Sequence, residues 1–269
     1  MEHVWYFLKV ALYPIAAIVV CGFVVWACQL LFIKILGRGG YKAVLVSSVV
    51  GTPIHEMGHA IMCLLFGHRI EKMVLWQPRS ADGTLGYVQH TYNRSNLYHR
   101  LGNLFIGTGP IFSGMAVLCL GLYFAFPGAW SAYSATVMPL VTRNAPVTEF
   151  LSAGVSIVPH MLREFGSGAA ALWAQILAVL VMLSVSLHIN LSPADIKGSL
   201  NAMVPYLVLA LLVTVVTTLI GAAVKAPVLA ALMTWNAYMM ALFTVVLTFA
   251  AVQVVLALII RLIVSVFRR

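Results

Sequence analysis

The chain carries very little charge for its length. Of its 269 residues, 9% are charged and only seven are Asp or Glu. Hydrophobic residues make up 62% of the chain, and the mean hydropathy is +1.00. These values exclude a water-soluble globular domain of this size. The composition therefore indicates an integral membrane protein, with room for one domain over residues 1–269 and none for a second, soluble domain.

The four cysteines include no Cys-x-x-Cys pair, and all of them lie in apolar runs. This pattern predicts packed thiols and argues against a disulfide framework or a cysteine metal site. The basic residues give a net charge of +9 but are scattered over loop ends. We therefore expect contact with lipid headgroups of the bilayer and no binding of nucleic acid. Residues 1–9 precede a long apolar run without a cleavage pattern, so we expect an anchor that is retained.

Six predominantly apolar stretches are long enough to cross a bilayer. They cover residues 10–36, 43–66, 101–126, 169–191, 201–224 and 228–260. The sequence therefore predicts an all-α polytopic membrane protein with about six transmembrane helices and both termini on one side. Ten Lys and Arg residues fall on the side of the termini and six on the other. This bias predicts that the termini face the cytoplasm.

The loop after the second stretch has a pattern of its own. Segments 69–76 and 85–92 contain Val, Leu, Tyr and Thr, and Asp82-Gly83 lies between them. Asp-Gly between two such segments is typical of a hairpin turn. We therefore expect a short membrane-associated β-hairpin directly after the second transmembrane helix.

Residues 55–59 read His-Glu-Met-Gly-His and lie inside the second apolar stretch. Positions i and i+4 of a helix project from the same face, so His55 and His59 can offer two imidazole nitrogens to one metal ion. Glu56 lies next to the first ligand, where a catalytic water needs a base. In soluble proteins this motif marks zinc metalloproteases, so the sequence predicts one catalytic Zn²⁺ in the membrane region.

A catalytic zinc ion normally takes three protein ligands, so the third must come from elsewhere in the chain. Most other acids lie at the N-terminus, in the hairpin or in the loop on the opposite side: Glu2, Glu71, Asp82, Glu149 and Glu164. Asp195 remains, at the end of the fourth stretch, where we expect Pro193 to break the helix and turn the chain back toward the bundle. His188, shortly before Pro193, is the alternative third ligand.

Three further histidines flank the predicted hairpin: His68, His90 and His99. Their position is typical of the polar membrane interface, and we expect structural roles for them.

This arrangement resembles the site-2 protease family of intramembrane zinc metalloproteases. In that family a span with His-Glu-x-x-His is followed by a membrane-associated β-hairpin, and a later span ends in an Asn-x-x-Pro motif whose aspartate supplies the third ligand. The resemblance covers about residues 43–200. It implies His55, His59 and Asp195 as zinc ligands and Glu56 as the base. We expect no PDZ or other soluble regulatory domain beside this membrane region.

Two departures from the family pattern indicate a divergent branch. Asn190 and Pro193 match the Asn-x-x-Pro spacing, but Asp195 follows the proline sooner than is usual. The family also carries Gly-Pro-x-x-Asn in an intermediate span, and here the match is 109–113, with Ser113 in place of Asn. The resemblance implies a role in substrate or oxyanion support for Ser113 and Asn190, with Asn103 as an alternative contributor.

We expect this chain to hydrolyse a peptide bond in or near the transmembrane segment of a membrane-embedded protein or peptide. The alternative is a metal-ion or proton-coupled transporter, because broken spans with intramembrane His and Asp also occur in ion pathways. A transporter has no need of Glu56 beside His55, which favours the protease. The compact size and the family resemblance suggest a bacterial cytoplasmic membrane, with the active site toward the cytoplasm.

Overall fold

The computed structural model describes residues 1–78, 80 and 83–267. This part of the chain forms ten helices and one two-stranded antiparallel sheet. The elements in chain order are α1 (Glu2–Leu36), α2 (Arg38–Leu65), β1 (Arg69–Val74), β2 (Tyr87–Thr91), α3 (Leu97–Ala125), α4 (Pro127–Thr142), α5 (Val147–Val155), α6 (Ile157–Glu164), α7 (Leu172–Ser186), α8 (Pro193–Leu200), α9 (Met203–Ile220) and α10 (Ala222–Phe267).

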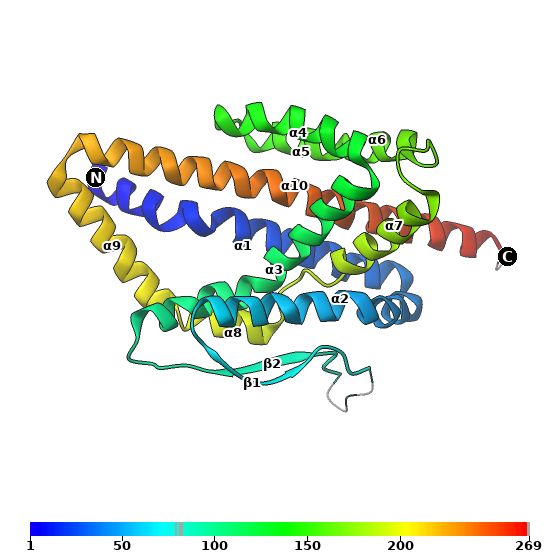
Figure 1. The fold of residues 1–269 in the computed structure, drawn as a ribbon, viewed down its shortest axis with the longest axis horizontal. Helices are drawn as coiled ribbons and strands as arrows, with labels where there is room; N and C mark the ends of the chain where they lie inside the picture. The colour runs from blue at the N-terminus through cyan, green and yellow to red at the C-terminus, as the bar shows by residue number, and fades with distance from the viewer. Residues whose placement is uncertain (79, 81–82, 268–269) are drawn as a thin grey trace.

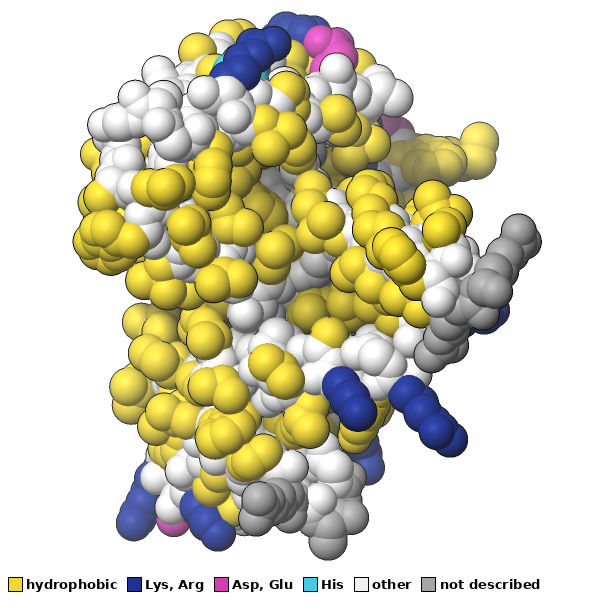
Figure 2. Space-filling view, turned by 90° about the vertical axis from the view of Figure 1, so that its right-hand side faces the viewer, with side chains coloured by type: hydrophobic (Ala, Val, Ile, Leu, Met, Phe, Trp, Pro, Cys, Tyr) yellow, Lys and Arg dark blue, Asp and Glu magenta, His cyan; other side chains and the backbone are white. Residues whose placement is uncertain are grey.

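Four of the described helices are long and apolar enough to cross a membrane: α1, α3, α9 and α10. Large apolar side chains remain exposed on them, such as Leu211, Leu212 and Leu219 of α9. Figure 2 shows hydrophobic side chains over most of the face that it views, with only scattered Lys and Arg. Such a surface is unfavourable in water and favourable in lipid, so it supports a membrane-embedded protein.

The other two predicted spans form α2 and α7, which are not among these four helices. The helix α7 ends after 15 residues. The helix α2 contains several Ser, Thr and Gly residues as well as the His-Glu-Met-Gly-His motif, and these residues lower its hydropathy. Each predicted stretch is therefore mostly helical, but the count of six spans is not confirmed.

The stretch between α3 and α7, which the sequence analysis treats as a loop, forms the three helices α4, α5 and α6. Pro127 starts α4 at a position where proline is favoured. The hydroxyl of Tyr133 on α4 donates a hydrogen bond to the carbonyl of Ala241 on α10. The carboxylate of Glu164, at the end of α6, accepts hydrogen bonds from backbone N–H groups in the first turn of α4. These contacts make the segment part of the helical core.

The helices α1 and α10 lie side by side along the long axis and run in the same direction, with the two termini at opposite ends (Figure 1). Both contribute to the main apolar core, α1 with Cys21 and Val25, α10 with Phe243 and Val246. Which side of the bilayer each terminus faces stays a prediction.

All four cysteines are free, and Cys21 and Cys63 are buried. The prediction of packed thiols is therefore confirmed for these two, whereas Cys28 and Cys119 are only partly buried.

The β-hairpin predicted after the second helix is present. Its strands pair antiparallel, with Arg69 opposite Thr91 and Val74 opposite Tyr87. The predicted turn at Asp82-Gly83 falls partly outside the described residues, since Asp82 is not among them. Gly83 has a φ of +77°, a conformation that glycine adopts at little cost.

The hairpin lies against α2, below it in the view of Figure 1. The indole Nε1 of Trp76 donates a hydrogen bond to the hydroxyl of Ser48 on α2, with a distance of 2.9 Å. Further along, Gly86 approaches α2 so closely that a Cβ atom there would lie 2.8 Å from Cγ2 of Thr52. The hairpin thus covers the face of α2 that carries the His-Glu-Met-Gly-His motif.

Candidate metal centre

The helix α2 places His55 and His59 one turn apart with their rings directed at the same point. Their Nε2 atoms are 3.2 Å apart. This geometry follows from the i, i+4 spacing, because both side chains project from one face of the helix. The two rings therefore converge on one point, as the spacing predicts, and what they bind there stays a prediction.

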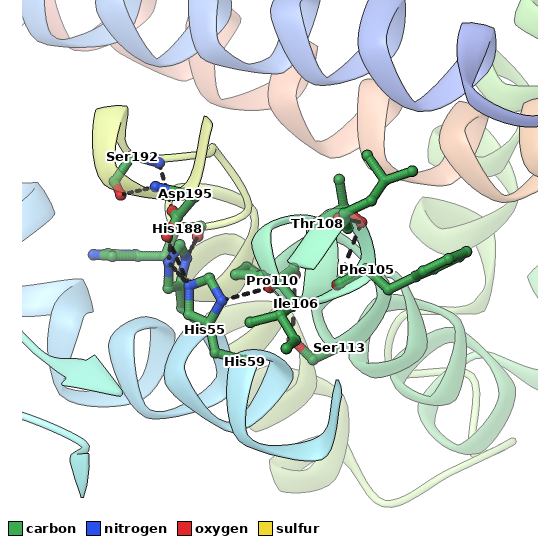
Figure 3. A network of polar contacts seen from close by, with 11 residues as sticks. His55, His59, Phe105, Ile106, Thr108, Pro110, Ser113, His188, Ser192 and Asp195 are labelled. Carbon is green, nitrogen blue, oxygen red and sulfur yellow. Dashed lines mark hydrogen bonds and ion pairs between the residues drawn. The ribbon is translucent and has the colours of Figure 1, made fainter. Parts of the chain in front are cut away.

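Asp195 joins the two histidines from α8. Its Oδ1 lies 3.1 Å from Nε2 of His59, and its Oδ2 lies 3.6 Å from Nε2 of His55. The ligand atoms of the three residues all lie within 4.8 Å of one another, so the group could hold a metal ion. Figure 3 shows the three side chains meeting between α2 and α8.

The start of α8 explains how Asp195 is positioned. The prediction that Pro193 breaks a continuing helix is wrong. The helix α7 ends earlier, at Ser186, and Pro193 begins α8. Proline is favoured in the first helical turn, because its missing N–H has no partner there in any case. Ser192 is the N-cap, accepting from the N–H of Asp195 at 3.2 Å, while Asp195 Oδ2 accepts from the N–H of Ser192 at 2.7 Å. This capping box holds the carboxylate toward the histidines.

The alternative ligand, His188, contributes to the site through its backbone. Nδ1 of His55 donates to the carbonyl oxygen of His188 at 2.8 Å, and Nδ1 of His59 donates to the carbonyl oxygen of Ile106 at 2.7 Å. A carbonyl oxygen can only accept, so each Nδ1 carries the proton. Each Nε2 therefore presents a lone pair to Asp195 and to the other histidine.

Three acceptors that face one another repel unless they share a cation. Without a metal ion, protonation of the histidines relieves this repulsion: burial alone would raise the pKa of Asp195, but the hydrogen bonds and charges of protonated His55 and His59 outweigh it and hold the pKa well below its ordinary value. Asp195 is therefore ionised at neutral pH. Two imidazole lone pairs and a carboxylate form a donor set suited to a divalent metal ion.

The unwound segment between α7 and α8 is buried at residues 187–189, and two glutamine side chains bond to its backbone and to the end of α7. Nε2 of Gln29 donates to the carbonyl of Leu187 at 2.8 Å. Nε2 of Gln253 donates to the carbonyl of Leu183 at 2.6 Å, near the end of α7. Non-helical backbone is tolerated at membrane depth only where such partners exist. The two glutamines, in otherwise apolar stretches, thus support the segment that leads to Asp195.

Glu56 is 5% exposed and lies beside the two histidines on the wall of a cavity of about 760 Å³. A Cβ atom at Gly86 would lie 2.9 Å from Cγ of Glu56, so the hairpin packs directly over this side chain. The cavity is bounded by α2, the hairpin, α3 and the segment 188–198, and its polar lining residues include Gln29, Thr52, His55, Glu56, His59, His90, Asn103, His188, Asn190, Ser192 and Asp195.

The two residues proposed to support substrate have different positions. Asn190 lines the cavity. Ser113 is not among the lining residues; its hydroxyl donates to the carbonyl of Ile54 at 2.8 Å and joins α3 to α2. Figure 3 places Ser113 apart from the group formed by His55, His59 and Asp195. The structure therefore gives Ser113 a helix-packing role, while Asn103 lies on the cavity wall.

The lining residues that sequence reasoning did not assign to the site include Gln29, Thr52 and His90. Thr52 and His90 had weak signals. Thr52 lies about one turn before His55 on α2, and His90 is two residues after Val88 in β2, on the same side of the strand. Gln29 is an amide in an otherwise apolar run, and this was the signal that it faces the protein interior.

The chain matches no known protein-family model, no curated protein and no solved structure.

Proposed function

We propose that this chain is an intramembrane zinc metalloprotease similar to the site-2 proteases. Its reaction is hydrolysis of a peptide bond in or near the transmembrane segment of a membrane-bound substrate. The observation that carries the proposal is the convergence of His55, His59 and Asp195 beside a buried Glu56, in one cavity under the hairpin. Metal binding alone does not require a carboxylate next to the first ligand, whereas hydrolysis does.

The spacing of the three ligand atoms supports zinc. Zinc bonds to His nitrogen and carboxylate oxygen are about 2.0 to 2.2 Å long, so two ligand atoms of a tetrahedral site are separated by about 3.3 to 3.5 Å. Here the two Nε2 atoms are 3.2 Å apart, Oδ1 of Asp195 lies 3.1 Å from Nε2 of His59, and its other oxygen, Oδ2, lies 3.6 Å from Nε2 of His55, so each carboxylate oxygen faces one histidine at a similar distance. Three protein ligands leave one position for a water molecule or a substrate carbonyl.

The chemistry divides between the metal and the protein. Bound zinc would lower the pKa of a water molecule and polarise the scissile carbonyl. Glu56 is placed to take a proton from the attacking water and to deliver it to the leaving amine. The carbonyls of His188 and Ile106 hold the two imidazoles in the ligating tautomer. The hairpin covers Glu56 and limits access of bulk water.

We infer that a peptide substrate lies in this cavity in an extended conformation. A helix hides its peptide bonds, so a transmembrane substrate must unwind locally to be cleaved. Residues 83–88 of the hairpin line the cavity beside Glu56. The hairpin can hold an unwound segment as an added strand, through backbone hydrogen bonds.

The same proposal includes the finer topology. We infer that α2 and α7 join α1, α3, α9 and α10 in the bilayer, which gives six membrane-embedded helices, and that the hairpin lies toward the cytoplasm. Single cysteines at Glu71 and at Glu149, in a chain without its native cysteines, test this with a membrane-impermeant maleimide. Labelling of Glu71→Cys in intact cells would contradict the cytoplasmic placement.

The decisive experiment for activity compares the purified chain with Glu56→Gln. The assay uses a set of fluorescein-labelled single-span peptides of about 30 residues in detergent micelles with zinc. Loss of the base should lower the rate of cleavage by about a hundred- to ten-thousand-fold. Zinc content and melting temperature should not change. Glu149→Gln, at an exposed acid of α5, is the matched control. Equal cleavage by Glu56→Gln and the unmodified chain would refute the mechanism.

The transporter alternative rests on the unwound segment between α7 and α8, since broken helices also occur at transport sites. Liposomes containing the chain and a zinc-sensitive dye separate the two functions. Zinc uptake together with no cleavage of any peptide would favour the transporter.

A further inference from the structure

Three histidines meet at the base of the hairpin, outside the metal group. His68 follows α2, His90 lies in β2 and His99 lies in α3. The ring of His68 is 4% exposed and stacks on Tyr92, with ring centroids 4.7 Å apart and planes at 16°. The sequence predicts only a polar interface here, but a continuous chain of hydrogen bonds connects these residues to the cavity.

The positions of the protons in this series of hydrogen bonds follow from its last acceptor, the carbonyl oxygen of His99. Nε2 of His68 lies 2.8 Å from the carbonyl oxygen of His99, which can only accept, so Nε2 carries the proton. In neutral His68, Nδ1 is then an acceptor. It lies 3.0 Å from Nδ1 of His90, which must therefore be the donor. Neutral His90 thus keeps its proton on Nδ1 and leaves Nε2 as an acceptor.

Both histidines are disposed to be neutral. Burial lowers the pKa of His68, and the nearby His99 adds to this effect, while the hydrogen bond to the His99 carbonyl opposes it. Burial also lowers the pKa of His90, together with the charges of His68 and His59. The hydrogen-bond chain therefore has the tautomers derived above at neutral pH.

His90 belongs to the wall of the cavity that contains Glu56. Gly86, directly before β2, lines this cavity together with Tyr87, Val88 and His90 of β2, whereas Gln89 beside His90 is exposed. Gly86 is the residue that packs on Glu56. Four residues of a strand span about 13 to 14 Å, so His90 lies about that far along β2 from Gly86.

We propose that His90 binds the substrate, accepting through Nε2 a hydrogen bond from a backbone N–H of the peptide about four residues from the cleaved bond. His68 is the positioning residue that keeps the proton off this Nε2. The inference rests on the proposed function, because it assumes that the substrate bond is cleaved beside Glu56. The group recognised is a peptide N–H, so a proline or an N-methyl residue at that position of the substrate would not be bound there.

The tautomer is measured directly in the full chain. Nitrogen-15 NMR of histidine-labelled protein in micelles, at a pH of about 7.5, reports which ring nitrogen carries the proton. The His90 signals are assigned with His90→Gln. We expect the proton of His90 on Nδ1, and a gain of the Nε2-protonated form in His68→Phe, which keeps the ring contact with Tyr92 but removes the acceptor. A proton on Nε2 of His90 in the unmodified chain would overturn the inference, whatever the chain cleaves.

Kinetics with a cleaved single-span peptide test the contact itself. One hydrogen bond lost from a buried site weakens binding by about tenfold. We expect KM to rise about tenfold in His90→Phe and His68→Phe, with kcat and zinc content unchanged. His90→Gln, whose amide can replace Nε2, and His68→Asn, whose amide oxygen can replace Nδ1, should stay near the unmodified KM. His160→Phe, on α6, is the control.

An N-methyl scan of the same peptide identifies the partner group. One N-methyl position, three to five residues from the cleaved bond, should weaken binding to zinc-loaded Glu56→Gln but not to the same chain with His90→Phe added. An equal effect at every position in both chains would overturn the inference. If no peptide is cleaved and Glu56→Gln changes nothing, the proposed function fails, and the tautomer measurement still decides the role of His68.

Discussion

Nδ1 of His55 donates a hydrogen bond to the carbonyl oxygen of His188, with a distance of 2.8 Å. This bond ties the first metal-group histidine on α2 to the unwound segment that leads to Asp195 on α8. The contact uses the backbone of His188, so its side chain is dispensable for it. On sequence alone, Asp195 and His188 compete for the place of third ligand. Because the His188 side chain takes no part in this bond, replacing it tests its role as a ligand without breaking the bond.

We predict that Asp195→Ala loses bound zinc and that His188→Ala retains it. The carboxylate of Asp195 lies 3.1 Å from Nε2 of His59, whereas His188 directs its Nδ1 to the carbonyl of Ser184 at 2.9 Å. Metal content of the purified full-length variants, measured by mass spectrometry after dialysis, is the test. We expect about one zinc per chain in His188→Ala and a large loss in Asp195→Ala.

The matched control for this experiment is Ser192→Ala. It removes the N-cap hydroxyl that accepts from the N–H of Asp195 but leaves the carboxylate in place. We expect it to lower the free energy of unfolding by about 1 kcal/mol and to keep its zinc. Equal zinc in Asp195→Ala and the unmodified chain would show that Asp195 is not a ligand.

The parts of this site that sequence could predict are those fixed by local spacing. The i, i+4 positions of His55 and His59 lie on one face of any helix, and the small number of acids singled out Asp195. The hairpin was predictable from segments of strand-forming residues on either side of a turn signal. In contrast, nothing local indicates that Ser113 faces Ile54, because that contact depends on how closely α3 approaches α2. The helices α4 to α6 were missed for a similar reason, since their apolar faces become informative only once α10 provides the opposing surface.

We predict that Gln29→Leu destabilises the segment between α7 and α8. Gln29 donates to the carbonyl of Leu187 at 2.8 Å, one residue before the carbonyl that accepts from His55. A buried carbonyl without a partner costs about 1 to 3 kcal/mol. Unfolding by SDS titration measures this loss, and zinc affinity should fall as well, because His55 and Asp195 depend on the same segment.

The control for the glutamine is Gln89→Leu, at an exposed position of β2. This change should leave both unfolding and zinc affinity near those of the unmodified chain. A Gln29→Leu protein as stable as Gln89→Leu would mean that the amide does not support the unwound segment.

We predict that Gly58→Ala pushes α2 and α3 apart. A Cβ atom at Gly58 would lie 2.6 Å from the carbonyl carbon and oxygen of Gly109 and 2.6 Å from Oγ of Ser113. Backbone atoms cannot move aside as a flexible side chain can, so overpacking should cost about 1 to 3 kcal/mol. Because Gly58 adjoins His59, zinc affinity should fall together with stability.

Gly39→Ala, also on α2, is the matched control, because a Cβ atom there meets nothing within 4 Å. It should be neutral or slightly stabilising, since alanine favours the helix over glycine. SDS titration of both variants measures the difference, and equal unfolding midpoints would argue against a close contact between α2 and α3.

We predict that protonation of the hairpin histidines destabilises the fold in mildly acidic solution. The pKa values of His68 and His90 are lowered, mainly by burial, so the folded chain favours their neutral forms. The unfolded chain binds protons near the ordinary histidine pKa of about 6.5, and in the interval below that value it holds more protons than the folded chain. The contribution of these residues to stability is therefore complete above about pH 6.5. It is lost as the pH falls from there through the lowered pKa values.

SDS titrations between about pH 5 and 7.5 test the sign. Zinc binding also depends on pH, so a chelator is present throughout. The groups that face the pair from neighbouring helices, His59 on α2 and His99 on α3, remain in every variant. Replacing both His68 and His90 by Phe should flatten the decrease in stability toward low pH, whereas His160→Phe should preserve it. An unchanged pH slope in the double variant would show that this pair does not couple protonation to folding, and the acid sensitivity would then have to come from groups elsewhere in the chain.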